Sequence, residues 1–288
     1  MIKSCNDIWA EISVVNNAKW EFLFLGKNND IPILVAKDYF KFPDKVNEFI
    51  SNGHWWTNGC NNFEAIVRPG KSYYVYPEIV DWFCDPLINS IRPLFGVNQI
   101  GIKSINGNCF NGDMLINDPR SVFPHTDLAD IDGNIHIEQS AHVACNINLT
   151  KSNNVKTGFW SFKGKKSWMD FSHNDRNEEA KFFESLRKSL PDNAKWFQID
   201  DYDQYKLEEI VEMSYNSFVA YPTCFLHNPY IKEDWFNDSD RITIAGFFDI
   251  LPKDLEFEQN DLGDVSYAWE FFHLDKVHNF HPKDTVLK

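Results

Sequence analysis

AHVACNINLT, residues 141–150, and TGFWSFKG, residues 157–164, are short apolar runs with the alternation that is typical of β-strands. Gly, Asn and Asp separate such runs over the whole segment from about residue 97 to 167. Four further runs show the same pattern: NQIGIKSI (98–105), CFNGDMLIN (109–117), SFVAYP (217–222) and DRITIAGFFDI (240–250). Strands are therefore expected to form the core of the protein.

Helical patterns flank these strands. After a strand-like run at 31–40, residues 43–50 are expected to form a helix with Pro43 in its first turn. A second helix is expected over 85–95. The polar segment 168–210 reads as an insertion between strands, with an amphipathic helix that begins at a cap on Asp175. Residues 265–280 also look helical.

The order of these patterns predicts one domain. No repeat or Pro/Gly/Ser-rich linker divides the 288 residues. The order of elements favours a mainly β fold, a sandwich or barrel with flanking helices. This order consists of two helices, a long run of short strands, a polar insertion and two more strands.

Composition excludes several classes of function. The net charge of −14 means that the average surface repels phosphate, so nucleic acid and anionic membranes are not expected partners. The start of the chain has no signal-peptide pattern, and no run approaches the roughly eighteen apolar residues of a membrane span. The six cysteines form no Cys-x-x-Cys pair and are expected to be reduced core thiols. A cytoplasmic location is expected.

Three His-x-Asp pairs are candidates for a metal site: His125 with Asp127, His173 with Asp175, and His273 with Asp275. On a strand, residues two apart share a face and can bind one ion, whereas on a helix they diverge. The second pair lies at an expected helix start, where Asp175 is better used as a cap, and the third lies in a helical pattern. The first follows Pro124 among strand-like runs and is therefore favoured.

A third ligand and an anion-binding group lie downstream of this pair. His227 follows the apolar run at 217–222, and Arg241 begins the next strand pattern, with Thr243 on the same face. An arginine that faces the interior of the domain needs an anion. Taken alone, each residue is more often structural: a hydrogen-bonded turn at 125–127, a core histidine, and a strand-end charge.

Together, His125-x-Asp127, His227 and Arg241 resemble the signature of iron(II)- and 2-oxoglutarate-dependent oxygenases. NINL (146–149) and TGFWSFKG resemble further segments of the prolyl-hydroxylase-like branch of that family. The resemblance covers about 97–167 and 214–250. Two features depart from the family pattern: Thr157 replaces a glycine, and the interval from His227 to Arg241 is long.

The resemblance implies a double-stranded β-helix, or jelly roll, as the core of a single domain 1–288. Residues 1–96 would supply an N-terminal strand and supporting helices, 97–250 the jelly roll with the 168–210 insertion, and 251–288 a helical extension. His125, Asp127 and His227 would bind Fe(II), which is suited to two imidazoles and one carboxylate. Arg241, with Thr243 as a second donor, would bind the far carboxylate of 2-oxoglutarate.

The activity that the resemblance implies is a dioxygenase reaction. It uses O2 and 2-oxoglutarate, with ascorbate as a stimulant, to hydroxylate an amino acid, a peptide or a small metabolite and release succinate. The carboxylate at Asp127 favours hydroxylation, or demethylation by the same step. Two alternatives stay open: a non-enzymatic jelly-roll binding module, and a cupin-type metalloenzyme that does not use 2-oxoglutarate. Substrate selection is expected in the loops at 52–76, 128–140 and 228–240, which do not name the substrate.

Overall fold

The computed structural model describes most of the chain. The described residues are 5–16, 18–51, 63–65, 68–74, 99–110, 123–127, 143–191, 204–232 and 234–251. The expected helices at 85–95 and 265–280 lie outside these ranges. Among the described residues, no helix combines the length and apolar character needed to span a bilayer.

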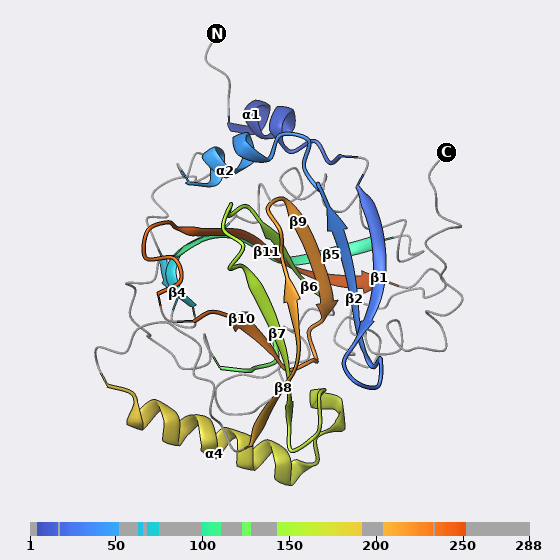
Figure 1. Cartoon of the computed structure of the whole chain (residues 1–288), viewed down its shortest axis with the longest axis vertical. Coiled ribbons are helices and arrows are strands. Elements are labelled where there is room, and N and C mark those ends of the chain that lie inside the picture. Colours follow the sequence, from blue (N-terminus) through green and yellow to red (C-terminus); the bar gives the residue numbers. More distant parts are fainter. Residues whose placement is uncertain are drawn as a thin grey trace.

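Eight strands form the larger of two sheets, in the spatial order β1-β2-β9-β6-β11-β5-β4-β3 (Figure 1). All neighbouring strands in it are antiparallel. The strands are β1 (Lys19–Leu25), β2 (Ile31–Lys37), β3 (Phe63–Ala65), β4 (Arg68–Tyr74), β5 (Gln99–Phe110), β6 (Val143–Asn148), β9 (Ser217–Pro222) and β11 (Arg241–Leu251). The expected strands at 98–105, 141–150, 217–222 and 240–250 are therefore present.

A smaller antiparallel sheet contains β10 (His227–Tyr230), β7 (Lys156–Phe162) and β8 (Tyr205–Glu212), in that spatial order. His125 extends it, because this residue forms an isolated antiparallel bridge with His227. Two arrays of four thus face each other: β9-β6-β11-β5 from the larger sheet, and His125-β10-β7-β8 from the smaller one. From β5 to β11, with His125 counted between β5 and β6, successive strands belong to opposite arrays, except that β7 and β8 both belong to the smaller sheet, in the manner of a jelly roll. The predicted mainly β fold with a jelly-roll core is confirmed.

Aromatic residues of and next to the N-terminal helices α1 (Cys5–Ile12) and α2 (Pro43–Ser51) pack on the outward face of the larger sheet at β9. Tyr39 stacks on Phe218 of β9 with ring centroids 5.1 Å apart, and Trp9 packs against Phe40 and Phe49. The helix expected at 43–50 is α2, and its apolar face is buried as the pattern predicted. This aromatic layer fixes the sheet whose other face looks into the jelly roll.

The segment between β7 and β8 differs from the expected insertion at its end. Residues 205–210 were expected in the insertion but belong to β8, the edge strand of the smaller sheet, because they pair with β7. The helix in this segment is α4 (His173–Ser189), which lies below the sheets in the view of Figure 1. The short 3-10 helix η3 (Trp168–Asp170) precedes it.

The cap of α4 was predicted one turn too late. Ser172 is the N-cap, and Asp175 occupies the third helical position, where the two side chains form a reciprocal capping box. Lys165 also binds the Asp175 carboxylate. These contacts hold the pKa of Asp175 well below its usual range, with the Lys165 hydrogen bond as the largest cause. Asp175 is thus committed to the helix terminus.

Glu179 of α4 is a buried acid at the contact between this helix and the smaller sheet. Tyr205 of β8 donates a hydrogen bond to its Oε1 at 2.7 Å, in a cluster that includes Phe162, Phe182 and Phe183. Burial raises the pKa of Glu179 to about 7. The folded protein therefore holds this proton more tightly than the unfolded chain does, and stability falls as the pH rises from the usual glutamate range towards 7.

Glu179→Gln is expected to stabilise the protein at pH 8 by about 2–3 kcal/mol, because the neutral amide avoids the buried charge and still accepts from Tyr205. Most of the gain should be lost at pH 4.5, where the wild-type carboxyl is protonated in the folded state and about half protonated in the unfolded chain. Urea denaturation at the two pH values measures the difference. The exposed acid Glu184 of the same helix provides the control, since Glu184→Gln should change little. An equal loss of stability at both pH values in Glu179→Gln would contradict a buried ionisation.

Candidate metal centre

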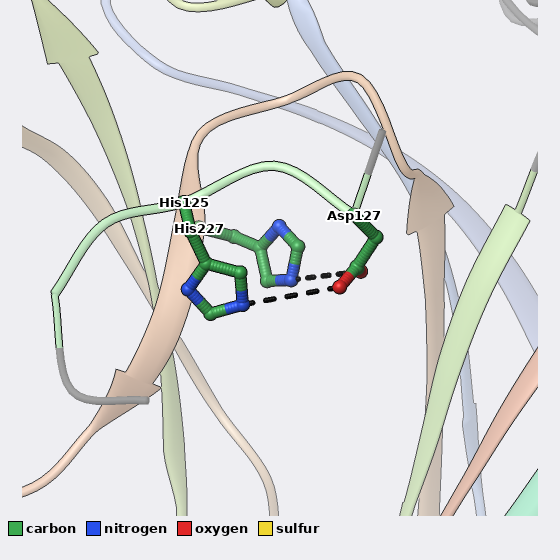
Figure 2. A group of neighbouring side chains, drawn as sticks. All are labelled: His125, Asp127 and His227. Atoms are coloured by element: carbon green, nitrogen blue, oxygen red, sulfur yellow. Dashed lines mark ion pairs between the residues drawn. The ribbon is translucent and has the colours of Figure 1, made fainter. Parts of the chain in front are cut away.

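Three side chains that are distant in sequence converge between the sheets: His125, Asp127 and His227 (Figure 2). Their candidate ligand atoms all lie within 4.8 Å of one another. The His227 Nε2 is 3.2 Å from Asp127 Oδ2, and the His125 Nε2 is 3.8 Å from Asp127 Oδ1. The side chains are 17%, 13% and 6% exposed for His125, Asp127 and His227, so the centre is largely shielded from water.

Backbone hydrogen bonds place the three residues. His125 and His227 exchange N–H···O=C bonds of 2.9 Å in both directions, which sets their side chains beside each other. After His125 the chain turns, and the Asp127 N–H donates to the carbonyl of Thr223 at 3.1 Å. Of the pair His125 and Asp127, only His125 forms a strand-like bridge, yet the side chains of both point towards His227.

Both imidazoles are held in the same way. The Nδ1 of His125 is 2.9 Å from the carbonyl oxygen of Phe123, and the Nδ1 of His227 is 2.9 Å from that of Phe225. A carbonyl can only accept, so each Nδ1 carries the proton in the neutral ring. That tautomer has its lone pair on Nε2, the atom that faces Asp127. This is the arrangement in which histidine binds a metal.

Packing beneath the two histidines supports these carbonyls. Phe183 of α4 meets Phe123 edge to face at 6.4 Å, so the inserted helix buttresses the residue that orients His125. The Tyr221 ring lies 4.6 Å from that of His227. A loss of either packing contact would let an imidazole rotate.

The strand that carries His227 is further fixed on its other face. Trp160 Nε1 donates to Asn228 Oδ1 at 2.8 Å, and both residues are buried. Gly158 lies opposite Asn228 in the ladder. A Cβ at Gly158 would come within 2.8 Å of both hydrogen-bonded atoms, so glycine leaves room for this pair.

Arg241 and Thr243 lie on the inward face of the larger sheet. Phe247 of β11 and Tyr221 of β9 are both cross-strand partners of Ala144, so they share a face, and Tyr221 contacts His227 of the opposite sheet. Residues two apart on a strand share that face, which places Thr243 and Arg241 on it as well. Arg241 is 7% and Thr243 is 1% exposed.

The buried hydroxyl of Thr243 bears on whether this face fits a polar ligand. Its buried Oγ1 has no hydrogen-bond partner among the described residues. A buried hydroxyl without a partner costs free energy, and a bound carboxylate oxygen would accept from it. A buried guanidinium two residues away on the same face adds the charge that such a ligand requires. The donor set therefore fits a carboxylate ligand.

The pair His173 and Asp175 does not form a metal centre. His173 is exposed at the start of α4, and Asp175 is bound to Ser172 and Lys165. The pair His273 and Asp275 lies outside the described residues. No other group of three His, Cys, Asp or Glu side chains comes together in the part of the chain that the structure describes.

Two of the six cysteines, Cys145 and Cys224, are buried and form no disulfide bond in the described part of the chain. Burial raises the pKa of each thiol to about 12, so both stay protonated.

Two inward-facing residues near the centre were not predicted as site residues. Asn146 of β6 donates through Nδ2 to the Tyr221 hydroxyl at 3.1 Å. The alternation in CNIN (145–148) places Asn146 and Asn148 on one face and is the signal that could have found Asn146. Nothing in the sequence pairs Asn146 with Tyr221, which lies 75 residues away.

No protein-family model matches the sequence, and no curated protein matches it. Among solved structures, HygX from Streptomyces hygroscopicus with nickel and 2-oxoglutarate bound is 14% identical, with a TM-score of 0.45 over 84% of this chain and 90% of that one. A prolyl-4-hydroxylase from Pseudomonas putida is 9% identical, with a TM-score of 0.37 over 85% of this chain and 98% of that one.

The carbocyclase SnoK from nogalamycin biosynthesis, which is non-heme and alpha-ketoglutarate dependent, is 14% identical with a TM-score of 0.35. That likeness covers 76% of this chain and 80% of SnoK. All three likenesses have TM-scores below 0.5. The fold assignment itself depends on the strand order.

Proposed function

We propose that this protein is an iron(II)- and 2-oxoglutarate-dependent dioxygenase that hydroxylates an amino acid, a peptide or a small metabolite. The observation that carries the proposal is the convergence of His125, Asp127 and His227, with both imidazoles held through Nδ1. Two imidazoles and one carboxylate with open positions beside them are typical of non-heme iron(II) oxygenases.

In this function the three side chains hold the iron, and the carbonyls of Phe123 and Phe225 keep the imidazoles in the binding tautomer. Arg241 and Thr243 hold the far carboxylate of 2-oxoglutarate by charge and hydrogen bonds. The low exposure of the triad limits access of bulk water. The bound iron supplies the O2 chemistry, by which a C–H bond, O2 and 2-oxoglutarate give C–OH, succinate and CO2.

Succinate formation tests the proposal without knowledge of the substrate. Protein with Fe(II), 2-oxoglutarate and ascorbate is expected to release succinate slowly in air, by turnover uncoupled from hydroxylation, and none without oxygen. Metal-dependent succinate release distinguishes this function from a non-enzymatic binding module. Binding of Mn(II) with no affinity for 2-oxoglutarate would instead favour a metalloenzyme of another reaction class.

We also propose a cellular location and a class of partner for this protein. The acidic chain is expected to act in the cytoplasm on a small molecule or peptide rather than on nucleic acid or at a membrane. Cell fractionation that finds the tagged protein in a membrane or envelope fraction would contradict the cytoplasmic location.

A further inference from the structure

Asn146 stands out among the residues that face the interior of the jelly roll. It is the cross-strand partner of Ala245 on β11 and of Val219 on β9, in the row next to that of Ala144, Tyr221 and Phe247. It therefore shares the inward face with Arg241, Thr243 and Tyr221. Along β11, Ala245 lies between Phe247 and Thr243. The row of Phe247 includes Tyr221, which contacts His227.

The exposure of Asn146 differs from that of its neighbours on β6. Every other residue of β6 is buried, whereas Asn146 is partly exposed. Its two cross-strand partners, Ala245 and Val219, are 3% and 1% exposed. Protein interiors are close-packed, so an inward side chain that solvent reaches borders an open space. His125, Asp127 and Phe247 are partly exposed as well.

The carboxamide of Asn146 is held at one end. Its Nδ2 donates one hydrogen to the Tyr221 hydroxyl, and the Tyr221 ring is fixed between His227 at 4.6 Å and Phe159 at 5.2 Å. An amide nitrogen carries two hydrogens, so the second one is left to donate. Among the described residues, Asn146 has no other hydrogen bond.

We propose that Asn146 contacts the co-substrate, donating its second Nδ2 hydrogen to an oxygen of the 2-oxoglutarate dianion between the triad and Arg241. Tyr221 is a positioning residue, which acts by holding the Asn146 carboxamide. The proposal deepens the proposed function and rests on it. It assigns a neutral amide donor to the middle of the pocket, in addition to the arginine and threonine farther along the same face.

The test is calorimetric titration of 2-oxoglutarate into the protein with Mn(II) in place of iron. Asn146→Asp, a near-isosteric change, replaces the donor with a negative oxygen and is expected to weaken 2-oxoglutarate binding at least about 10-fold. Asn146→Ala should weaken it about 3- to 10-fold, and Tyr221→Phe about 2- to 5-fold because the amide loses its anchor. Asn174→Asp, at an exposed position of α4, is the matched control and should bind like wild type.

Mn(II) affinity, titrated without co-substrate, separates ligand contact from structural support. All variants are expected to keep a Mn(II) dissociation constant within about twofold of wild type, which a purely structural role for Asn146 would not allow. Wild-type affinity for 2-oxoglutarate in Asn146→Asp would overturn the inference, and so would a parallel loss of Mn(II) binding. If wild-type protein with Mn(II) does not bind 2-oxoglutarate at all, the proposed function itself fails, which is a distinct result.

Discussion

His227→Ala is expected to abolish succinate formation and to weaken Mn(II) binding at least about 100-fold. Loss of residues that merely orient metal ligands costs 10- to 100-fold in affinity, so the loss of a ligand itself should cost more. The alanine leaves the backbone bonds between residues 125 and 227 intact, because these come from the main chain. Metal affinity by calorimetry and succinate release by chromatography measure the two effects.

The chain offers a matched control for this change. His173→Ala removes a histidine from another His-x-Asp pair, but that residue is exposed at the start of α4. It should keep both metal affinity and succinate release. If His227→Ala bound Mn(II) as tightly as His173→Ala does, His227 would not be a ligand, and the proposed centre would be wrong.

Arg241→Ala is expected to weaken 2-oxoglutarate binding by about 2–5 kcal/mol, roughly 30-fold or more, while Mn(II) binding is unchanged. The physical reason is that the buried guanidinium provides both the positive charge and the paired donors for a carboxylate. Titration of 2-oxoglutarate in the presence of saturating Mn(II) measures the loss. Arg241→Lys keeps the positive charge but lacks the planar guanidinium with its paired donors. Its affinity for 2-oxoglutarate should therefore lie between those of the wild type and Arg241→Ala.

Arg187→Ala serves as the control, because Arg187 is exposed on α4 and should not affect the ligand. Undiminished 2-oxoglutarate affinity in Arg241→Ala, with Mn(II) still bound, would show that the anion is held elsewhere. A metalloenzyme of another class would then become the better explanation for the triad.

The choice among the three His-x-Asp pairs could be made from sequence because side-chain periodicity is a local property. Pro124 and the strand-like surroundings favoured His125 and Asp127, and the structure brings these two to His227. The jelly-roll order was predictable only with the family resemblance. Alternating runs predict strands, but they do not say which strands pair.

The long-range pairing of β8 and the exact N-cap of α4 could not be predicted from the sequence. Residues 205–210 look polar because β8 is an edge strand that carries Lys206, Glu208 and Glu209, so they were assigned to the insertion. Ser172 and Asp175 are both good caps, and only the backbone geometry decides between them. The carbonyls of Phe123 and Phe225, which orient the imidazoles, carry no side-chain signal at all.

The pairing of Asn146 with Tyr221 shows the same limit. Alternation places Asn146 on a face with Asn148, yet its partial exposure depends on how the two sheets pack against each other. A polar residue on an inward strand face is therefore a useful sequence signal for a site, but its partner comes from the fold.

Diffraction at the manganese absorption edge, from crystals grown with Mn(II) and 2-oxoglutarate, tests the metal centre most directly. The expected result is an anomalous peak about 2.1 Å from the Nε2 atoms of His125 and His227 and from a carboxylate oxygen of Asp127. An anomalous map with manganese bound elsewhere, and none among these three side chains, would contradict the metal centre on which the proposed function depends.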